Sequence, residues 1–222
     1  MSGSLVLFGA GGLGLEVVAA LHALGPDRAP TLTDVIDEGE GRLDEMAALV
    51  GHAPRTHRSV RTVEGLADKL ALVALGDPAT RARKFGELRE QGARFAVLIH
   101  PLAHVAPGAR IGAGCFVAPF AYIGPGAVLE DNVLVNVRAT IGHDTSVGAH
   151  GVISPHANIN GDVTLGRETL VASSTAIQRG VSIGAGCKVA AGSVVTVDFE
   201  AGCLIHGNPA KGRRMFAVAA NG

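Results

Sequence analysis

The sequence predicts a small parallel α/β sheet over residues 1–98, an all-β solenoid of short parallel strands over 99–203, and a C-terminal tail over 204–222. Three observations support this division. Apolar runs alternate with helical patterns at the start of the chain. From Ile99 onward, aliphatic residues recur every six positions. The chain is 47% apolar, yet only 4% of its residues are aromatic and none is Trp. Because aromatic rings usually fill much of a core, we expect a core that is thin and regular.

Composition and charge exclude several classes of protein. The 222 residues include 19 Lys and Arg and 20 Asp and Glu, so the net charge is −1, which does not suggest DNA or an anionic membrane as a partner. No apolar run reaches the roughly 18 residues of a membrane span, and no basic start precedes the first apolar stretch. Three cysteines, an odd number, argue against a disulfide scaffold. We therefore expect a cytoplasmic protein without nucleic-acid or membrane partners.

The first part shows the order of a parallel sheet with helices on its faces. Gly25-Pro26 ends the first expected helix, and Gly92 ends the second. Residues 38–64 show no clear pattern. The expected strands are Leu5–Phe8, Leu32–Ile36, Leu70–Leu75 and Phe95–Ile99, and the expected helices are Leu15–Leu24 and Ala79–Gln91.

The second part has a strict period of six. Seventeen consecutive positions, from Ile99 to Val195, carry Ile, Val or Leu at this spacing, and the residue four places after each of the first sixteen, from Ala103 to Ser193, is small or β-branched. A fixed short period predicts a solenoid. Three six-residue sides make a coil of 18 residues, and the inward aliphatic of each side stacks on its equivalent about 4.8 Å along the axis. Such a prism has little room for aromatic rings.

His143 is the polar residue of most interest inside the repeats. It follows the inward Ile141 by two residues and therefore faces outward, with Pro125 one coil before it and Gly161 one coil after it. A glycine stacked on a histidine leaves open space and a backbone N–H beside the imidazole. This pairing suits acyl transfer, with a general base for the nucleophile and a donor for the oxyanion. Asp144 either orients the imidazole or makes only its own turn bonds.

The N-terminal GAGGLG segment is a glycine-rich turn between a strand and a helix. Gly9, Gly11 and Gly14 fit the dinucleotide fingerprint loosely, and a tight structural turn explains them equally well. Asp37 ends the second expected strand, where it would meet a ribose or a base. Fewer than 100 residues are available here, so a Rossmann-like domain for a mononucleotide-sized ligand is the better interpretation.

Taken together, these motifs resemble the sugar O- and N-acetyltransferases of the NeuD and PglD type over nearly the entire chain. The resemblance implies a left-handed parallel β-helix of hexapeptide repeats, a handedness that the period alone does not give. Besides IGHD at His143, the matching segments are GAGGLGLEVV (9–18), VIDE (35–38), ALGDPATR (74–81), LIHP (98–101) and GNPAK (207–211).

The resemblance implies an acetyl-CoA-dependent N-acetyltransferase that acts on a nucleotide-linked amino sugar, works as a homotrimer and forms no acyl-enzyme. His143 would be the general base, Asp144 its acidic neighbour, and the Gly161 amide would meet the thioester carbonyl. Further coenzyme A contacts fall on Ser173 and Ala191. The implied nucleotide-sugar contacts are Gly9, Gly11, Gly12, Gly14, Asp37, Gly76 and Asp77.

The chain departs from the family pattern at Leu13, Val152 and His156, and we expect these changes on the acceptor side. They leave the sugar open, together with the choice between an amine and a hydroxyl acceptor such as sialic acid or a serine-like group. A non-catalytic nucleotide-binding solenoid also stays an alternative. The zinc sites of hexapeptide carbonic anhydrases need a His pair two coils apart, and no His pair here has that 36-residue spacing, so we expect no metal.

Overall fold

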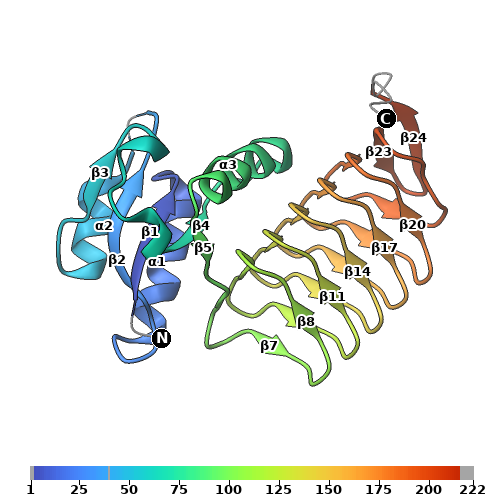
Figure 1. The fold of residues 1–222 in the computed structure, drawn as a ribbon. Coiled ribbons are helices and arrows are strands. Elements are labelled where there is room, and N and C mark those ends of the chain that lie inside the picture. Colours follow the sequence, from blue (N-terminus) through green and yellow to red (C-terminus); the bar gives the residue numbers. More distant parts are fainter. Residues whose placement is uncertain (1–2, 40, 216–222) are drawn as a thin grey trace.

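The computed structural model describes residues 3–39 and 41–215, which form an α/β part and a long three-sided β-helix (Figure 1). Sheet A of the α/β part is parallel, with the order β3-β2-β1-β4-β5. Its elements are β1 Ser4–Phe8, α1 Gly12–Leu24, β2 Thr31–Ile36, α2 Leu43–Val50, β3 Arg55–His57, β4 Leu70–Val73, α3 Pro78–Glu90 and β5 Arg94–Phe95, with single 3-10 turns at Val60–Thr62 and Leu66–Asp68.

The β-helix consists of two-residue strands in three parallel sheets, each strand pairing with the one 18 residues further along. Sheet B contains β6 Leu98–Ile99, β9 Phe116–Val117, β12 Leu134–Val135, β15 Val152–Ile153, β18 Leu170–Val171 and β21 Lys188–Val189. Sheet C contains β7 His104–Val105, β10 Tyr122–Ile123, β13 Thr140–Ile141, β16 Asn158–Ile159, β19 Ala176–Ile177 and β22 Val194–Val195. Sheet D contains β8 Arg110–Ile111, β11 Val128–Leu129, β14 Ser146–Val147, β17 Thr164–Leu165 and β20 Ser182–Ile183.

The core of the β-helix is the column of inward aliphatics that the period predicts. From Val117 to Val195 every one of these side chains is almost completely buried, and the small residues of the corners pack beside them. Cys115 and Cys187 occupy two of the small inward positions and are fully buried as free thiols. This narrow core accounts for an apolar chain with so few aromatic rings.

The expected single strand Phe95–Ile99 is wrong, because the chain changes sheets in the middle of it. β5 pairs with β4 of sheet A, whereas β6 pairs with β9 of sheet B. The Ala96 N–H donates to Ala71 O of the α/β part, and the Leu98 N–H already donates to Cys115 O of the next coil. The ladder of the coils therefore begins within the segment that periodicity alone assigns to one strand.

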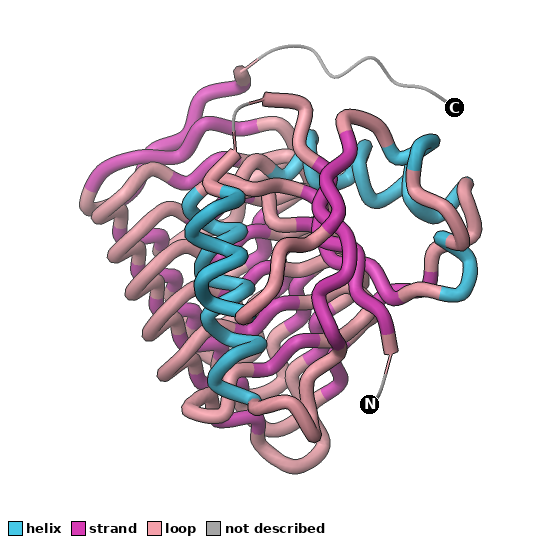
Figure 2. Tube along the Cα trace, turned by 90° about the vertical axis from the view of Figure 1, so that its left-hand side faces the viewer, coloured by secondary structure: helices cyan, strands magenta, loops and turns pink. Residues whose placement is uncertain are grey.

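The α/β part packs on the outer face of sheet B. Phe116, Leu134 and Val152 point outward from that sheet and share one buried cluster with Leu7 of β1 and Val17 of α1. Figure 2 shows the helices of the α/β part lying over the stacked coils. The two parts thus share a hydrophobic core.

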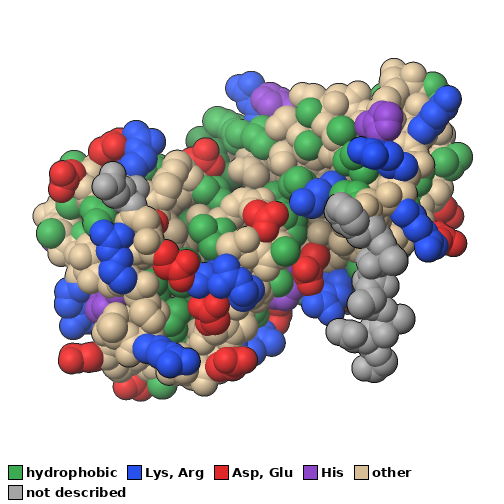
Figure 3. Space-filling model, turned by 90° about the horizontal axis from the view of Figure 1, so that it is seen from above, with side chains coloured by type: hydrophobic (Ala, Val, Ile, Leu, Met, Phe, Trp, Pro, Cys, Tyr) green, Lys and Arg blue, Asp and Glu red, His purple; other side chains and the backbone are tan. Residues whose placement is uncertain are grey.

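The segment assigned to a C-terminal tail includes a β-hairpin. β23 Cys203–Gly207 pairs with β21 and so continues sheet B, and β24 Ala210–Arg214 returns antiparallel to it. Residues 216–222 lie outside the described part of the chain. No helix among the described residues is long and apolar enough to span a bilayer. The surface seen in Figure 3 carries acidic and basic side chains interspersed, in keeping with the near-zero net charge.

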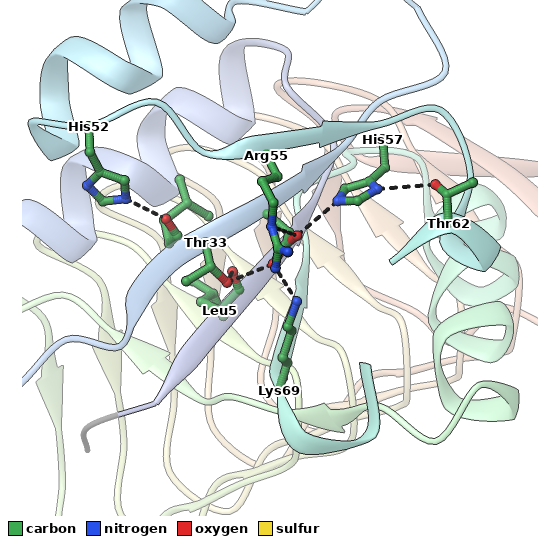
Figure 4. Close-up of polar contacts among 9 residues, drawn as sticks. Leu5, Thr33, His52, Arg55, His57, Thr62 and Lys69 are labelled. Carbon is green, nitrogen blue, oxygen red and sulfur yellow. Dashed lines mark hydrogen bonds and ion pairs between the residues drawn. The ribbon is translucent and has the colours of Figure 1, made fainter. Parts of the chain in front are cut away.

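A buried carboxylate organises one side of sheet A. Asp34 of β2 is fully buried and pairs with Lys69, Arg55 and His57. Figure 4 shows these three side chains pointing toward one another. The Lys69 Nζ lies 2.7 Å and the His57 Nε2 lies 2.9 Å from its oxygens, and the Thr33 hydroxyl donates to it as well. Burial alone would raise the pKa of Asp34, but the hydrogen bonds from these partners outweigh it and lower the pKa to about 2.

The Asp34→Asn variant is expected to lower the free energy of unfolding by about 3 kcal/mol, because it leaves Lys69 nearly buried without its counter-charge. In the native protein this contribution is present above about pH 4 and is lost as the pH falls toward 2. Urea unfolding at pH 7 measures the change. Asp27→Asn, at an exposed acid, is the control; equal stability of the two variants would contradict a stabilising role for the cluster.

Candidate functional site

His143 and Asp144 lie in the turn between β13 and β14, at the corner where sheet C meets sheet D. Asp144 has a φ of 56°, a left-handed conformation that also occurs at the same place in neighbouring repeats. Its Oδ2 lies 2.9 Å from His143 Nδ1. The carboxylate therefore accepts the Nδ1 proton of a neutral imidazole, and Nε2 is left as the basic nitrogen. Of the two roles considered for Asp144, this geometry supports orientation of the imidazole.

Two glycines, one coil before and one coil after, make room for this pair. A Cβ at Gly161 would stand 2.4 Å from His143 Nε2, and a Cβ at Gly126 would stand 2.4 Å from Asp144 Oδ1. The imidazole thus lies directly against the Gly161 backbone. The Gly161 N–H takes part in no hydrogen bond among the described residues, and Gly161 lines the groove beside His143.

A groove of about 610 Å³ runs past His143 and Gly161. Its walls also include Asn158, Asn160 and Arg179, which are not among the predicted site residues. Asn158 Oδ1 accepts a bond from Thr140 Oγ1, and Arg179 pairs with Asp162 at 2.6 Å. Reading the sequence in steps of 18 from Thr140 and His143 would have found Asn158 and Arg179, because side chains one coil apart are neighbours along the prism.

His143, Asp144 and Asp162 have ligand atoms within 4.8 Å of one another. All three are exposed, and each is already in a bonded pair, His143 with Asp144 and Asp162 with Arg179. Such an exposed group is common without an ion, and we base no metal site on it.

The glycines of the first turn fall into two classes. Gly9 has a φ of 104° and its Cβ would stand 2.6 Å from Ala74 O; a Cβ at Gly14 would stand 2.4 Å from Gly9 O. These two are required by the close packing of the turn itself. A Cβ at Gly11 or Gly12 would have nothing within 4 Å, and the same holds for Gly76, three residues after β4. The backbone at these three glycines therefore faces open space.

Asp37 and Asp77 accept hydrogen bonds from nearby backbone N–H groups and so stabilise the loops in which they lie. Asp37 accepts bonds from the Ala10 N–H at 2.6 Å and the Gly39 N–H at 2.8 Å. Asp77 caps α3 by accepting from the Thr80 N–H, which lowers the pKa of its carboxyl. The strand order of sheet A reverses between β1 and β4, and open α/β sheets bind ligands at the carboxyl ends of strands at such a point. The predicted nucleotide contacts therefore line the edge at which a ligand is expected.

One chain does not bring the predicted site residues together. His143, Asp144 and Gly161 lie at the corner between sheets C and D, which in a three-sided prism is opposite sheet B. Ser173 and Ala191 lie at the corner between sheets B and C. The predicted nucleotide-sugar contacts belong to the α/β part, which covers sheet B.

The three departures from the family pattern are also dispersed. Val152 is 2% exposed in the core shared by the two parts, and Leu13 packs against the same cluster. His156 is exposed at the corner between sheets B and C. None of the three lines the groove at His143.

The fold and the repeat define a left-handed β-helix of the hexapeptide class. Residues 95–125 match the family described as "Bacterial transferase hexapeptide (six repeats)", whereas no curated protein matches the chain.

Solved structures resemble nearly the whole chain. The acetyltransferase domain of PglB from Neisseria gonorrhoeae FA1090, in complex with acetyl coenzyme A, is 29% identical over 96% of this chain and 100% of that chain, with a TM-score of 0.85. PerB from Caulobacter crescentus, in complex with CoA and GDP-perosamine, is 27% identical over 95% and 97%, with a TM-score of 0.83. WeeI from Acinetobacter baumannii AYE, 21% identical over 96% and 100% with a TM-score of 0.75, supports the fold alone.

These findings confirm the predicted fold and the resemblance. The chain is similar over nearly its whole length to a solved acetyltransferase domain and to a perosamine N-acetyltransferase, and it carries the hexapeptide repeat of bacterial transferases.

Proposed function

We propose that the protein transfers the acetyl group of acetyl-CoA to the amine of a nucleotide-linked amino sugar. The observation that carries the proposal is the His143–Asp144 pair, held against a glycine whose N–H is unengaged among the described residues, beside an open groove. The PglB domain bound to acetyl coenzyme A and PerB bound to CoA and GDP-perosamine support the two substrate classes.

In the proposed reaction, His143 Nε2 takes a proton from the sugar amine as its nitrogen attacks the thioester carbonyl. The Gly161 N–H donates to the oxyanion that forms, and Asp144 keeps the Nδ1 proton in place and stabilises the imidazolium. When the C–S bond breaks, the proton passes from His143 to the CoA thiolate. A C–N bond has then replaced the C–S bond, and no acyl-enzyme has formed.

For the ligands, we propose that coenzyme A contacts Gly161, Ser173 and Ala191, and that the α/β part holds the nucleotide. The proposed nucleotide-sugar contacts are Gly9, Gly11, Gly12, Gly14, Asp37, Gly76 and Asp77.

Because these groups lie at three places on one chain, the proposed site is completed by a neighbouring copy, and we propose a homotrimer with the coenzyme between subunits. Leu102, Phe120 and Tyr122, all between 40% and 57% exposed, provide an apolar surface along sheet C and its corner with sheet B that a second copy would cover.

The His143→Ala variant is expected to lose roughly 10²–10⁴-fold in kcat, because removal of a general base costs about that much. Release of the CoA thiol is measured against a panel of nucleotide-linked amino sugars and hydroxyl acceptors. His206→Ala, at an exposed histidine of β23 outside the site, controls for loss of a surface imidazole. Near-full transfer by His143→Ala to every acceptor would rule out the mechanism; activity of the native protein on hydroxyls alone would indicate O-acetylation.

Gly161→Ala is expected to abolish most activity without unfolding the chain. Its methyl carbon would stand 2.4 Å from His143 Nε2 and displace the imidazole from the base position. Thermal melting and thiol release are compared with those of Gly186→Asn. Gly186 has nothing within 4 Å of a Cβ, and Asn132 adopts its conformation at an equivalent place, so that variant should behave as native. Full activity of Gly161→Ala would show that the position of the His143 imidazole does not depend on the absence of a side chain at residue 161.

A further inference from the structure

Arg81 of α3 joins the α/β part to the β-helix. Its side chain is fully buried, and its guanidinium donates to Val73 O at 2.6 Å and Leu75 O at 2.9 Å in the α/β part. The same group donates to Asn132 O and Asn132 Oδ1, both at 2.9 Å, at the corner between sheets D and B. Burial lowers the pKa of Arg81 to about 10, and all of these partners are neutral oxygens. A buried cation held by four carbonyl oxygens from two parts of the chain fixes those parts relative to each other.

The orientation of the Asn132 side-chain amide determines which nitrogen of His150 carries a proton. Because Asn132 Oδ1 accepts from Arg81, its Nδ2 must be the atom that lies 2.9 Å from His150 Nδ1. Nδ2 is a donor only, so His150 Nδ1 must carry a lone pair. The amide cannot be reversed without placing its NH₂ group against the Arg81 guanidinium. The chain of bonds therefore requires a neutral His150 with its proton on Nε2.

The surroundings of His150 favour that neutral form. Its ring packs edge-on against Phe85 of α3, and burial lowers the pKa of His150. The charged groups that face it are Arg81 and Arg89 from α3, and Arg167 and Glu168 from the next coil. Arg89 is itself paired with Asp131.

The location of Arg81 links these bonds to the proposed substrate edge. Val73 ends β4, and Leu75 directly precedes Gly76 and Asp77, two of the proposed nucleotide-sugar contacts. α3 begins at the next residue, capped by Asp77. Arg81 therefore bonds to Val73 O and Leu75 O, next to Gly76 and Asp77, and so fixes the position of this edge relative to the β-helix.

We propose that Arg81, Asn132 and His150 form a positioning relay, which holds the nucleotide-facing edge of the α/β part on the β-helix and is intact only while His150 Nδ1 is unprotonated. The expected effect on the KM for the nucleotide sugar rests on the proposed function, whereas the expected effect on the stability of the fold does not. Protonation would place an Nδ1–H against the Asn132 amide hydrogens and open the relay.

The sign of the pH effect follows from the lowered pKa of His150. The unfolded chain binds a proton near pH 6.5, and the folded chain binds it only at lower pH. The relay's contribution to stability is thus fully present above about pH 6.5 and is lost as the pH falls through the folded-state pKa. Under acid conditions the KM for the nucleotide sugar should rise, while the KM for acetyl-CoA should stay nearly constant.

Asn132→Asp is the sharpest test, because it exchanges a donor for an acceptor at the same place. Asp144 and Asp162 adopt the same backbone conformation in equivalent repeats, so the change is compatible with the φ of 58°. The new carboxylate would accept from both Arg81 and a protonated His150. We expect the native Tm to fall between pH 7 and pH 5 and the Tm of Asn132→Asp to fall clearly less. His150→Gln, whose side-chain oxygen accepts from Asn132, should also lose the steep dependence.

His156→Gln is the matched control, since His156 lies one repeat later in the same backbone conformation and is exposed. Its Tm should follow the native pH dependence. Equal slopes for native protein, Asn132→Asp and His150→Gln would overturn the relay, and if Asn132→Asp does not fold, His150→Gln decides alone. In the native enzyme, an acid-dependent rise in both KM values together would overturn the positioning role. Because the Tm comparison needs no substrate, it stands even if the acetyl-transfer proposal fails.

Discussion

The uninterrupted six-residue register is the constraint on which the rest of the structure depends. Since every side has six residues, each residue lies beside the residue 18 positions further along, over all the coils from Leu98 to Val195. That spacing places Gly161 against His143 and Gly126 against Asp144, and the missing Cβ atoms of the two glycines leave room for the proposed base and its carboxylate partner. An insertion of one residue between Asp144 and Gly161 would move Gly161 out of register with His143.

The second constraint is the contact between the α/β part and the β-helix. An apolar contact through Phe116, Leu134 and Val152 attaches the α/β part to sheet B, and the buried Arg81 sets its position through directional bonds. As a result, the proposed nucleotide edge and His143 of one chain lie on different sides of the prism. Under the proposed function, a site built from these residues needs a second copy, and the orientation of the α/β part on its own coils then matters to that site.

The sequence was sufficient for features that depend on local periodicity. The inward aliphatics, the outward orientation of His143 and the glycine beside it all follow from counting in sixes and eighteens, whereas the structure places His143 in a corner turn and not on a side of the prism. Elements that depend on distant partners were missed. α2 is short and lies in a stretch without clear pattern, and the boundary within Phe95–Ile99 is set by which strand each residue meets. The roles of Arg81 and Val152 arise from contacts between the two parts, which no spacing within either part reveals.

The claim that the site is shared between copies is tested most directly by mixing two inactive variants. His143→Ala removes the base, and Gly11→Trp blocks the nucleotide edge at a glycine whose surroundings are open. Acetyl transfer is measured for each variant alone and after co-expression in equal amounts. If each site takes its base from one copy and its nucleotide edge from another, about one quarter of the sites in the mixture combine two intact halves and activity returns to that level. A mixture of folded, oligomeric subunits as inactive as either variant alone would contradict the account.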